Sequence, residues 1–257
     1  MSISKIFLYD APSVPEIKIN DLAEFIQKQT GINTEVRQEF LRHFHAKEKT
    51  FQQLASCRIF NPYIPFERHK PTVEETTFEE QSETTDSASD NIILYDGFEI
   101  QNIFRDIIPD SESSVDKFHL IFTTRLTCSY DYNDYRYHGR VVICSNPAII
   151  STTGMIEAPA KPRDYYLQIY KKILHGLNLD TIKQEFKGRF LEYYDERISL
   201  VTRGYALQAM FYYLTGSPFC ESRKCMLYNA HWQEDLLYAQ IEIGKLCDQH
   251  QNILDNL

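Results

Sequence analysis

The first third of the chain changes from alternating to helical spacing of apolar residues and back again. Residues 5–9 form a short apolar and aromatic run closed by Asp10 and two prolines, which predicts a strand. Helical spacing from residue 20 or 21 onward predicts a helix that Gly31 ends, and residues 33–36 predict a returning strand. This strand, helix, strand order favours a parallel pair in an α/β-like layer.

The middle of the chain predicts a second set of strands. Residues 92–95 form a short strand, followed by a helix over 98–107 that ends before Pro109. Residues 118–124 and 137–144 are apolar enough for two further strands, and the tyrosine-rich segment between them contains turn-forming Asn and Asp. We expect these two strands to form an antiparallel hairpin at a sheet edge, with residues 147–162 as an irregular loop.

The C-terminal third is predicted to be helical. Helices are expected over 165–174, 180–194 and 197–214, the last of them amphipathic, and one more from Asn229 to Gly244. The pattern as a whole predicts an α+β fold with a mixed sheet, organised as a single domain over residues 1–257. Within it, residues 71–91 are rich in Glu, Asp, Thr and Ser without Lys or Arg, which predicts an acidic, disordered insertion.

Composition excludes several classes of protein. With 43% hydrophobic and 13% aromatic residues among 257, the chain is expected to bury a substantial core. A formal net charge of −9 disfavours nucleic acid and anionic membranes as partners. The sequence contains no apolar run of the roughly 18–20 residues that a membrane span needs, and no signal segment, so we expect a cytoplasmic protein.

Four potential metal ligands stand close together near the end of the sequence. Cys220 and Cys225 are separated by four residues, and Cys247 and His250 by two. Zinc accepts thiolate and imidazole in a closed tetrahedron, so this Cys3His set predicts one structural zinc ion per chain within residues 217–257. The alternative is that the cysteines are packed thiols or a local disulfide and that His250 is a surface residue.

The same residues carry a resemblance to a known family. Gly216, Cys220 and Cys225 fall where archaemetzincins have the end of their HExxHxxGxxH motif and the following Cys-x4-Cys-x-Met. Leu227 stands where that family has Met, and Cys247 with His250 stands in for its second cysteine pair. The chain also resembles an archaeal family of metallopeptidase-like proteins. These resemblances imply a metzincin-like fold, with a mixed sheet and an antiparallel edge strand.

The resemblance also implies that the catalytic site is degenerate. Ala209, Tyr213 and Phe219 occupy the positions of the three zinc-binding histidines, and Met210 occupies that of the general base. Peptide hydrolysis of this type needs an open-site zinc and a carboxylate that accepts a proton. Neither Ala, Met nor Phe supplies such a group. Residues 209–213 are instead expected to form a packed helix core.

Another constellation of residues offers acid–base chemistry. Arg136 and His138 lie in the predicted hairpin, and Glu157 lies in the proline-rich loop beyond it. A carboxylate and an imidazole beside a cleft can transfer protons, although residues at such positions are also ordinary on a solvated strand or turn.

Three functions are therefore compatible with the sequence. The first is a zinc-stabilised protein that binds a peptide or protein without hydrolysing it, by adding the peptide to the edge strand. The second is an active metal-dependent peptidase with unusual ligands. The third is a structural interaction module.

Overall fold

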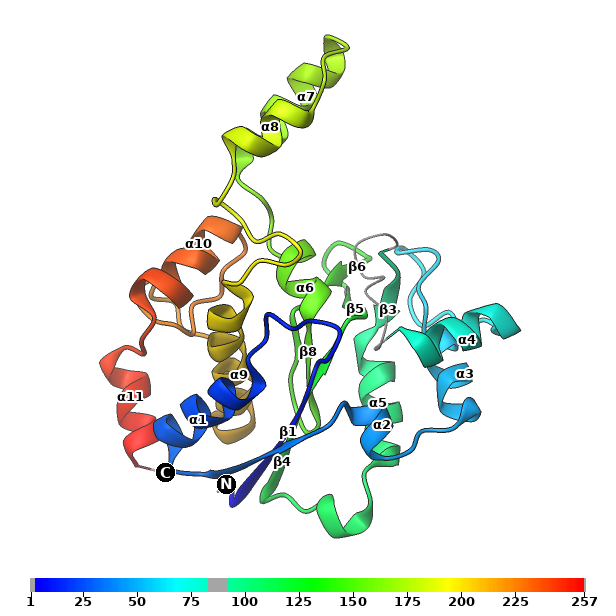
Figure 1. Ribbon diagram of the computed structural model, residues 1–257, viewed down its shortest axis with the longest axis vertical. Coiled ribbons are helices and arrows are strands. Elements are labelled where there is room, and N and C mark those ends of the chain that lie inside the picture. The colour runs from blue at the N-terminus through cyan, green and yellow to red at the C-terminus, as the bar shows by residue number, and fades with distance from the viewer. Residues whose placement is uncertain (1–2, 83–91, 257) are drawn as a thin grey trace.

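The computed structural model describes residues 3–82 and 92–256 (Figure 1). The strands are β1 (Lys5–Tyr9), β2 (Asn33–Arg37), β3 (Leu94–Asp96), β4 (Lys117–Thr123), β5 (Leu126–Asp131), β6 (Arg136–Gly139), β7 (Val142–Ile143) and β8 (Ala148–Ser151). The helices are α1 (Ile19–Thr30), α2 (Phe40–His43), α3 (Glu48–Ser56), α4 (Val73–Gln81), α5 (Gly97–Ile107), α6 (Thr152–Glu157), α7 (Arg163–Leu174), α8 (Asp180–Glu185), α9 (Ile198–Thr215), α10 (Gln233–Leu237) and α11 (Asp248–Asp255). A 3-10 turn occupies Asp110–Glu112, and a π-helical turn occupies Tyr238–Ile243.

The larger sheet has the strand order β2-β1-β4-β8-β7. Its first four strands are parallel, and β7 pairs antiparallel to β8. The predicted strand, helix, strand opening is confirmed, and Gly31 ends α1 in the left-handed conformation at φ 70°. The α+β class with a mixed sheet and a helical C-terminal third is also confirmed.

The predicted hairpin between 118–124 and 137–144 is wrong. The hairpin pairs β5 with β6 in a second sheet of order β3-β5-β6, whereas β4 lies in the larger sheet. The segment 137–144 does not form one strand, because it crosses from one sheet to the other. The amide of Arg140 donates to the carbonyl of Thr127 at 2.7 Å, and Val141 accepts from the amide of Ser151 at 2.7 Å.

The predicted loop over 147–162 contains a strand and a helix. The buried residues 148–150 belong to strand β8, which pairs with β4, and α6 begins directly after this strand. The Ser151 hydroxyl accepts from the amide of Gly154 at 2.8 Å and so caps α6. Prolines at both ends concealed this short strand and helix in the sequence.

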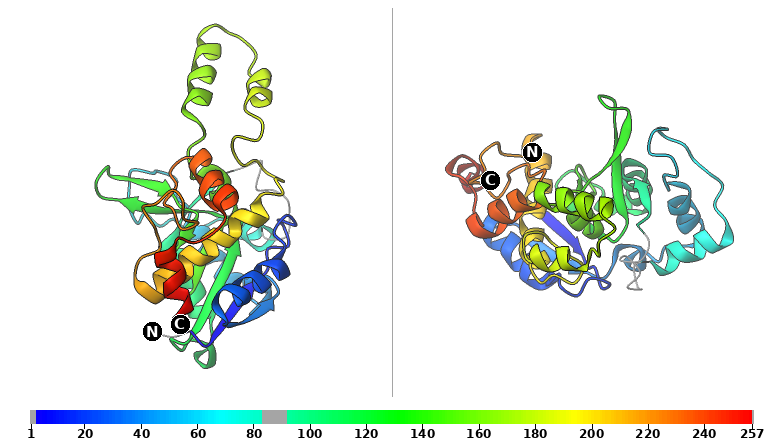
Figure 2. Two further views of the ribbon diagram at one scale, coloured as in Figure 1. Left: turned by 90° about the vertical axis from the view of Figure 1, so that its left-hand side faces the viewer. Right: turned by 90° about the horizontal axis from the view of Figure 1, so that it is seen from above.

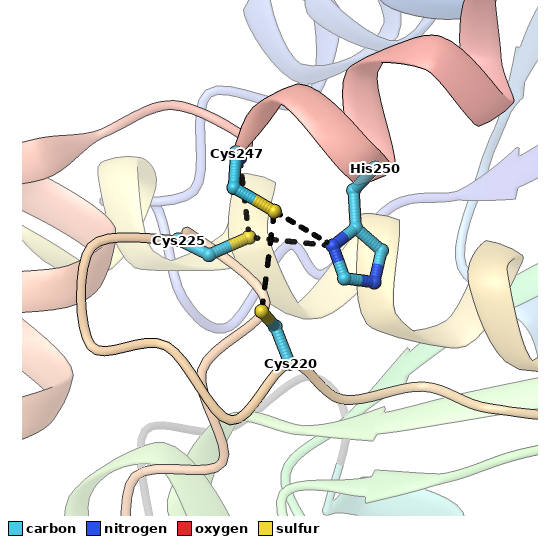
Figure 3. A group of neighbouring side chains, drawn as sticks. All are labelled: Cys220, Cys225, Cys247 and His250. Atoms are coloured by element: carbon cyan, nitrogen blue, oxygen red, sulfur yellow. Dashed lines mark hydrogen bonds between the residues drawn. The ribbon is translucent and has the colours of Figure 1, made fainter.

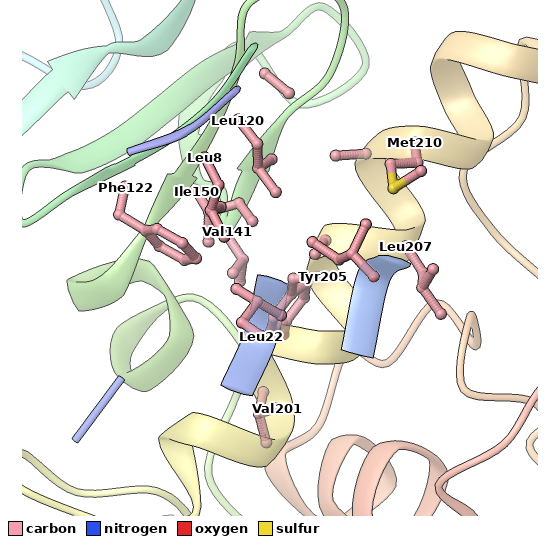
Figure 4. Packing of buried hydrophobic residues seen from close by; sticks show 14 of the residues in the cluster. Leu8, Leu22, Leu120, Phe122, Val141, Ile150, Val201, Tyr205, Leu207 and Met210 are labelled. Atoms are coloured by element: carbon pink, nitrogen blue, oxygen red, sulfur yellow. The ribbon is translucent and has the colours of Figure 1, made fainter. Parts of the chain in front are cut away.

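Helices cover both faces of the larger sheet (Figure 1). On β1, Ile6 and Leu8 face α1 and α9, while Phe7 and Tyr9 face α2, α3 and α5. Helix α9 is buried along most of its length, between the sheet on one side and the C-terminal segment on the other (Figure 4). It is therefore apolar nearly all round, not amphipathic as predicted.

Disorder over 71–91 is wrong for residues 73–81, which form α4; residues 83–91 lie outside the described residues. Thr72 caps α4 through a capping box with Glu75. The carboxylate of Glu79 is fully buried and accepts from Arg58 at 2.6 Å, from Arg125 at 2.7 Å and from the hydroxyl of Tyr95 at 2.7 Å. The acidic segment thus supplies a buried counter-ion for two arginines.

Helices α7 and α8 form an arm that projects from the body of the molecule (Figures 1 and 2). The arm has its own small core, and α8 is shorter than the helix predicted over 180–194. Lys and Arg outnumber Asp and Glu over residues 161–189, although the chain as a whole is acidic. Several large apolar side chains of α7 are exposed, among them Tyr170, Ile173 and Leu174.

The last predicted helix begins later than expected. Trp232 occupies the N-cap position of α10, so Asn229 does not cap it. The helix continues into the π-helical turn and ends at Gly244, which is left-handed at φ 57°. None of the described helices is long and apolar enough to cross a membrane.

Substitution of Glu79 tests whether its buried ion pairs hold α4 against the rest of the protein. We expect Glu79→Ala to lower the free energy of unfolding by about 3–5 kcal/mol, because it removes the fully buried carboxylate that pairs with both Arg58 and Arg125. Chemical denaturation measures this change. The exposed neighbour Glu80 is the control, and Glu80→Ala should change stability by no more than about 0.5 kcal/mol. Equal effects of the two substitutions would contradict the buried network.

Candidate metal centre

The four predicted ligands come from two segments that meet beside the end of α9. Cys220 and Cys225 lie on the loop after α9, and Cys247 and His250 lie at the start of α11. Backbone hydrogen bonds hold the loop in shape: the amide of Cys220 donates to Leu227 at 2.9 Å, and that of Met226 donates to Lys245 at 2.8 Å. The second bond joins the two ligand-bearing segments.

The structure brings these four side chains into one group (Figure 3). All four potential ligand atoms lie within 4.8 Å of one another. The sulfur atoms of Cys220 and Cys247 are 4.0 Å apart. The Nδ1 atom of His250 lies 3.8 Å from the sulfur of Cys225 and 3.0 Å from that of Cys247.

These separations fit a tetrahedral zinc ion. With Zn–S bonds of about 2.3 Å and Zn–N bonds of about 2.0 Å, a regular tetrahedron places sulfur atoms about 3.8 Å apart and sulfur about 3.5 Å from nitrogen. The observed distances scatter around these values. Cys220, Cys225, Cys247 and His250 are therefore positioned to bind one ion, and a full set of four protein ligands leaves no open coordination position.

The surroundings of the cluster suit thiolate ligands. The amide of Ser222 donates to the sulfur of Cys220 at 3.4 Å, and the amide of Cys247 donates to that of Cys225 at 3.4 Å. Burial raises the pKa of Cys225 to about 12. Burial also acts to raise the pKa of Cys247, but hydrogen bonds from His250 and the other thiols outweigh it and lower this pKa to about 7. A bound cation favours deprotonation of all three thiols.

The residues that the archaemetzincin resemblance places at catalytic positions do not form a group of potential metal ligands. Ala209 and Met210 are completely buried in the core of the larger sheet (Figure 4). The hydroxyl of Tyr213 donates to the carbonyl of Val115 at 2.7 Å. Phe219 is 44% exposed and lines a pocket. These side chains pack in the core or lie at the surface. None of Ala, Met or Phe offers a ligand atom that binds zinc.

This pocket has a volume of about 210 Å³ and lies between α9, the β6–β7 segment and the loop that carries Cys220 and Cys225. The pocket is lined by apolar residues, such as Tyr205 and Leu236, and by polar residues from several elements. The polar and charged residues that line it are His138, Arg140, Gln208, Asn229, His231 and Gln240.

Sequence reasoning missed most of these pocket residues. Gln208 and Gln240 are each only 2% exposed, although they sit in otherwise apolar helices. A glutamine on a buried helix face is a signal that the sequence does contain. That both line the same pocket depends on tertiary structure that the sequence pattern does not give.

Of the alternative acid–base residues, Arg136 and His138 share the carboxylate of Asp134. Among Arg136, His138 and Glu157, only His138 lines the pocket. The carboxylate of Asp134 accepts from Arg136 at 2.7 Å and lies 2.8 Å from the imidazole of His138, and this pair of contacts holds its pKa low. Asp131, Asp134 and His138 form a second group of potential metal ligands at the tip of the hairpin.

Comparison with known proteins decides the family. A profile of the probable metallopeptidase family (DUF6775) matches residues 2–257. The chain belongs to this family. Searches of curated proteins and of solved structures gave no match. Membership of the DUF6775 family agrees with the metallopeptidase-like character predicted from the sequence, while the closer likeness to archaemetzincins stays a prediction.

Removal of one ligand tests the metal centre. We expect Cys220→Ser to reduce the bound metal from about one ion per chain to well under half, and to lower the melting temperature by about 5–15 °C, because metal binding stabilises only the folded chain. Elemental analysis and thermal unfolding measure these effects. Cys144, which is half-buried and lies outside the cluster, provides the control Cys144→Ser. Unchanged metal content in Cys220→Ser would rule out the predicted ligand set.

Proposed function

We propose that this member of the DUF6775 family binds a peptide or protein segment without hydrolysing it, and that its one zinc ion is structural. The observation that carries the proposal is the contrast between two sites. Four ligands for a closed metal site are close together, whereas Ala209 and Met210 stand fully buried where the archaemetzincin resemblance implies a catalytic ligand and base.

The contrast matters because the two kinds of zinc site do different chemistry. A catalytic zinc needs an open position, where it lowers the pKa of bound water, and a nearby base to accept the proton. The Cys3His cluster offers four protein ligands and leaves water no position. The cluster therefore supports a role in holding the metal-bearing loop against α9.

The pocket beside the β6–β7 segment is the proposed binding site. Its 210 Å³ volume is small compared with the roughly 300–1,000 Å³ of pockets for drug-sized ligands, so it suits one side chain of a longer ligand. Addition of a peptide strand is restricted at β6, because the amide of Tyr137 already donates to the carbonyl of Pro62 at 2.8 Å. At β7, the outer strand of the larger sheet, only Val142 and Ile143 are available. Side-chain capture in the pocket is thus favoured over a long added strand.

A second candidate function is an active peptidase with unusual metal ligands. The group of Asp131, Asp134 and His138 favours it, because His138 also lines the pocket. However, Asp134 is engaged by Arg136 and His138, and its position at the exposed hairpin tip gives no barrier to water. The non-hydrolytic function is therefore preferred.

Counting metal ions separates the two functions. We expect about one tightly held zinc per chain and no cleavage of a casein substrate, with or without added zinc. Elemental analysis and a fluorescence cleavage assay measure both quantities. A second, exchangeable metal that is required for cleavage, and that is lost in Asp134→Asn, would establish the peptidase instead.

Filling the pocket tests peptide binding. We expect the protein to retain peptides from an immobilised library of random octapeptides, and Ala230→Trp to weaken retention of the best binder at least tenfold, because the indole occupies the pocket that Ala230 lines. The exposed Ser113, which lies outside the pocket, gives the control Ser113→Trp. Zinc bound without any retained peptide would indicate a structural interaction module.

A further inference from the structure

Gln240 carries a buried amide that makes no hydrogen bond within residues 3–82 and 92–256. The side chain is 2% exposed and lines the pocket. Neither its oxygen nor its nitrogen has a hydrogen-bond partner among the residues that the structure describes. Buried polar groups normally have partners, because losing their hydrogen bonds to water destabilises the folded chain.

The neighbouring glutamines show how unusual this is. Gln233, seven residues earlier, is fully buried, and its nitrogen donates to the carbonyls of Met155 at 2.9 Å and Ile156 at 3.1 Å. Its oxygen accepts from the amide of Leu191 at 3.2 Å. Gln208 donates to the carbonyl of Tyr228 at 3.3 Å. Gln240 alone of these three has both amide atoms without a partner in the described part of the chain.

Two features of the backbone hold Gln240 in place. It lies in the π-helical turn Tyr238–Ile243, and such turns inside helices often occur at functional sites. It also lies against Gly204 of α9: a Cβ atom at position 204 would come within 2.5 Å of the amide carbon and oxygen of Gln240. The absence of a side chain at 204 makes room for the amide between the two helices.

The chemistry of the amide limits what can satisfy it. A primary amide presents a donor and an acceptor side by side in one plane. A trans peptide group has its N–H and C=O on opposite sides, so it can pair with only one of the two atoms. Another primary carboxamide presents both groups on the same side and can pair with both at once. In a peptide, such a group is the side chain of Gln or Asn.

We propose that the pocket recognises the side-chain carboxamide of a Gln or Asn residue in the bound peptide, through reciprocal hydrogen bonds with Gln240. This inference rests on the proposed peptide-binding function for its biological setting. The pairing itself concerns only the carboxamide group and can be tested with single capped amino acids.

Three capped amino acids provide the binding test. N-acetyl-L-glutamine methylamide is titrated into ¹⁵N-labelled protein, beside the corresponding glutamate and methionine compounds, while the side-chain NH₂ resonance of Gln240 is followed by NMR. We expect this resonance to shift to saturation with the glutamine compound, at an affinity at least tenfold higher than with the methionine compound. Equal responses to all three compounds, or an amide that contacts only a bound water, would overturn the proposal.

Stability measurements on the two buried glutamines give an independent test. Gln240→Met keeps the side-chain volume and removes an amide without partners, so we expect the melting temperature of the ligand-free protein to rise by about 3–6 °C while binding of the glutamine compound is lost. The matched variant Gln233→Met removes an amide with three hydrogen bonds and should lower the melting temperature. A fall for Gln240→Met would show a purely structural amide and contradict the proposal.

The results also separate this inference from the proposed function. Binding of the glutamine compound without retention of any octapeptide would support the carboxamide site and reject peptide binding. Retention of octapeptides irrespective of Gln or Asn content, and undiminished in Gln240→Met, would support peptide binding and reject the carboxamide site.

Discussion

Burial of α9 along most of its length is the constraint on which the rest of the structure depends. Its inner side packs on the parallel strands, and that contact is a normal layer of sheet and helix. Its outer side is equally apolar and needs a cover. The cover is the segment after Gly216, which contributes Cys225, Met226, Leu227 and Leu246 to the same core; its residues 217–232 lie in no named helix or strand, and its helices α10 and α11 are short. A metal ion that joins Cys220 and Cys225 to Cys247 and His250 would hold this irregular cover in place.

The burial of α9 also argues against a catalytic role for this helix. Zinc ligands and a general base must face a cleft that substrate and water reach. At the positions where the predicted archaemetzincin resemblance would place a ligand and a base, this helix has Ala209 and Met210 completely inside the core. The polar groups that line the small pocket come from α9 itself, through Gln208, and from other elements, such as His138 and Gln240. Recognition by hydrogen bonds is the chemistry that such groups support.

The features predicted best from the sequence are those that depend on residues close together in the chain. The four potential metal ligands lie together as predicted because short spacing brings each pair together, and Gly31 and Gly244 ended helices as expected. Features that depend on distant partners were missed. An ordered α4 requires Arg58 and Arg125 around Glu79, and nothing near Glu79 in the sequence indicates them. Strand β5 was missed because its polar, tyrosine-rich end resembles a linker. Gln240 was missed because its place in the pocket depends on packing against Gly204 of another helix.

The arm formed by α7 and α8 lies outside this dependence on α9. Its core of Tyr165, Ile182, Phe186 and Phe190 is separate from the core of the larger sheet. Contact with the body includes the surface ion pair between Arg189 and Glu234 at 2.7 Å, an interaction of little energy in water. Hydrogen bonds from Arg197, at the start of α9, to the carbonyls of Gly188 and Phe190 also tie the arm to the body. Because the arm's core is small and separate, we expect its amide hydrogens to exchange faster than those of the larger sheet.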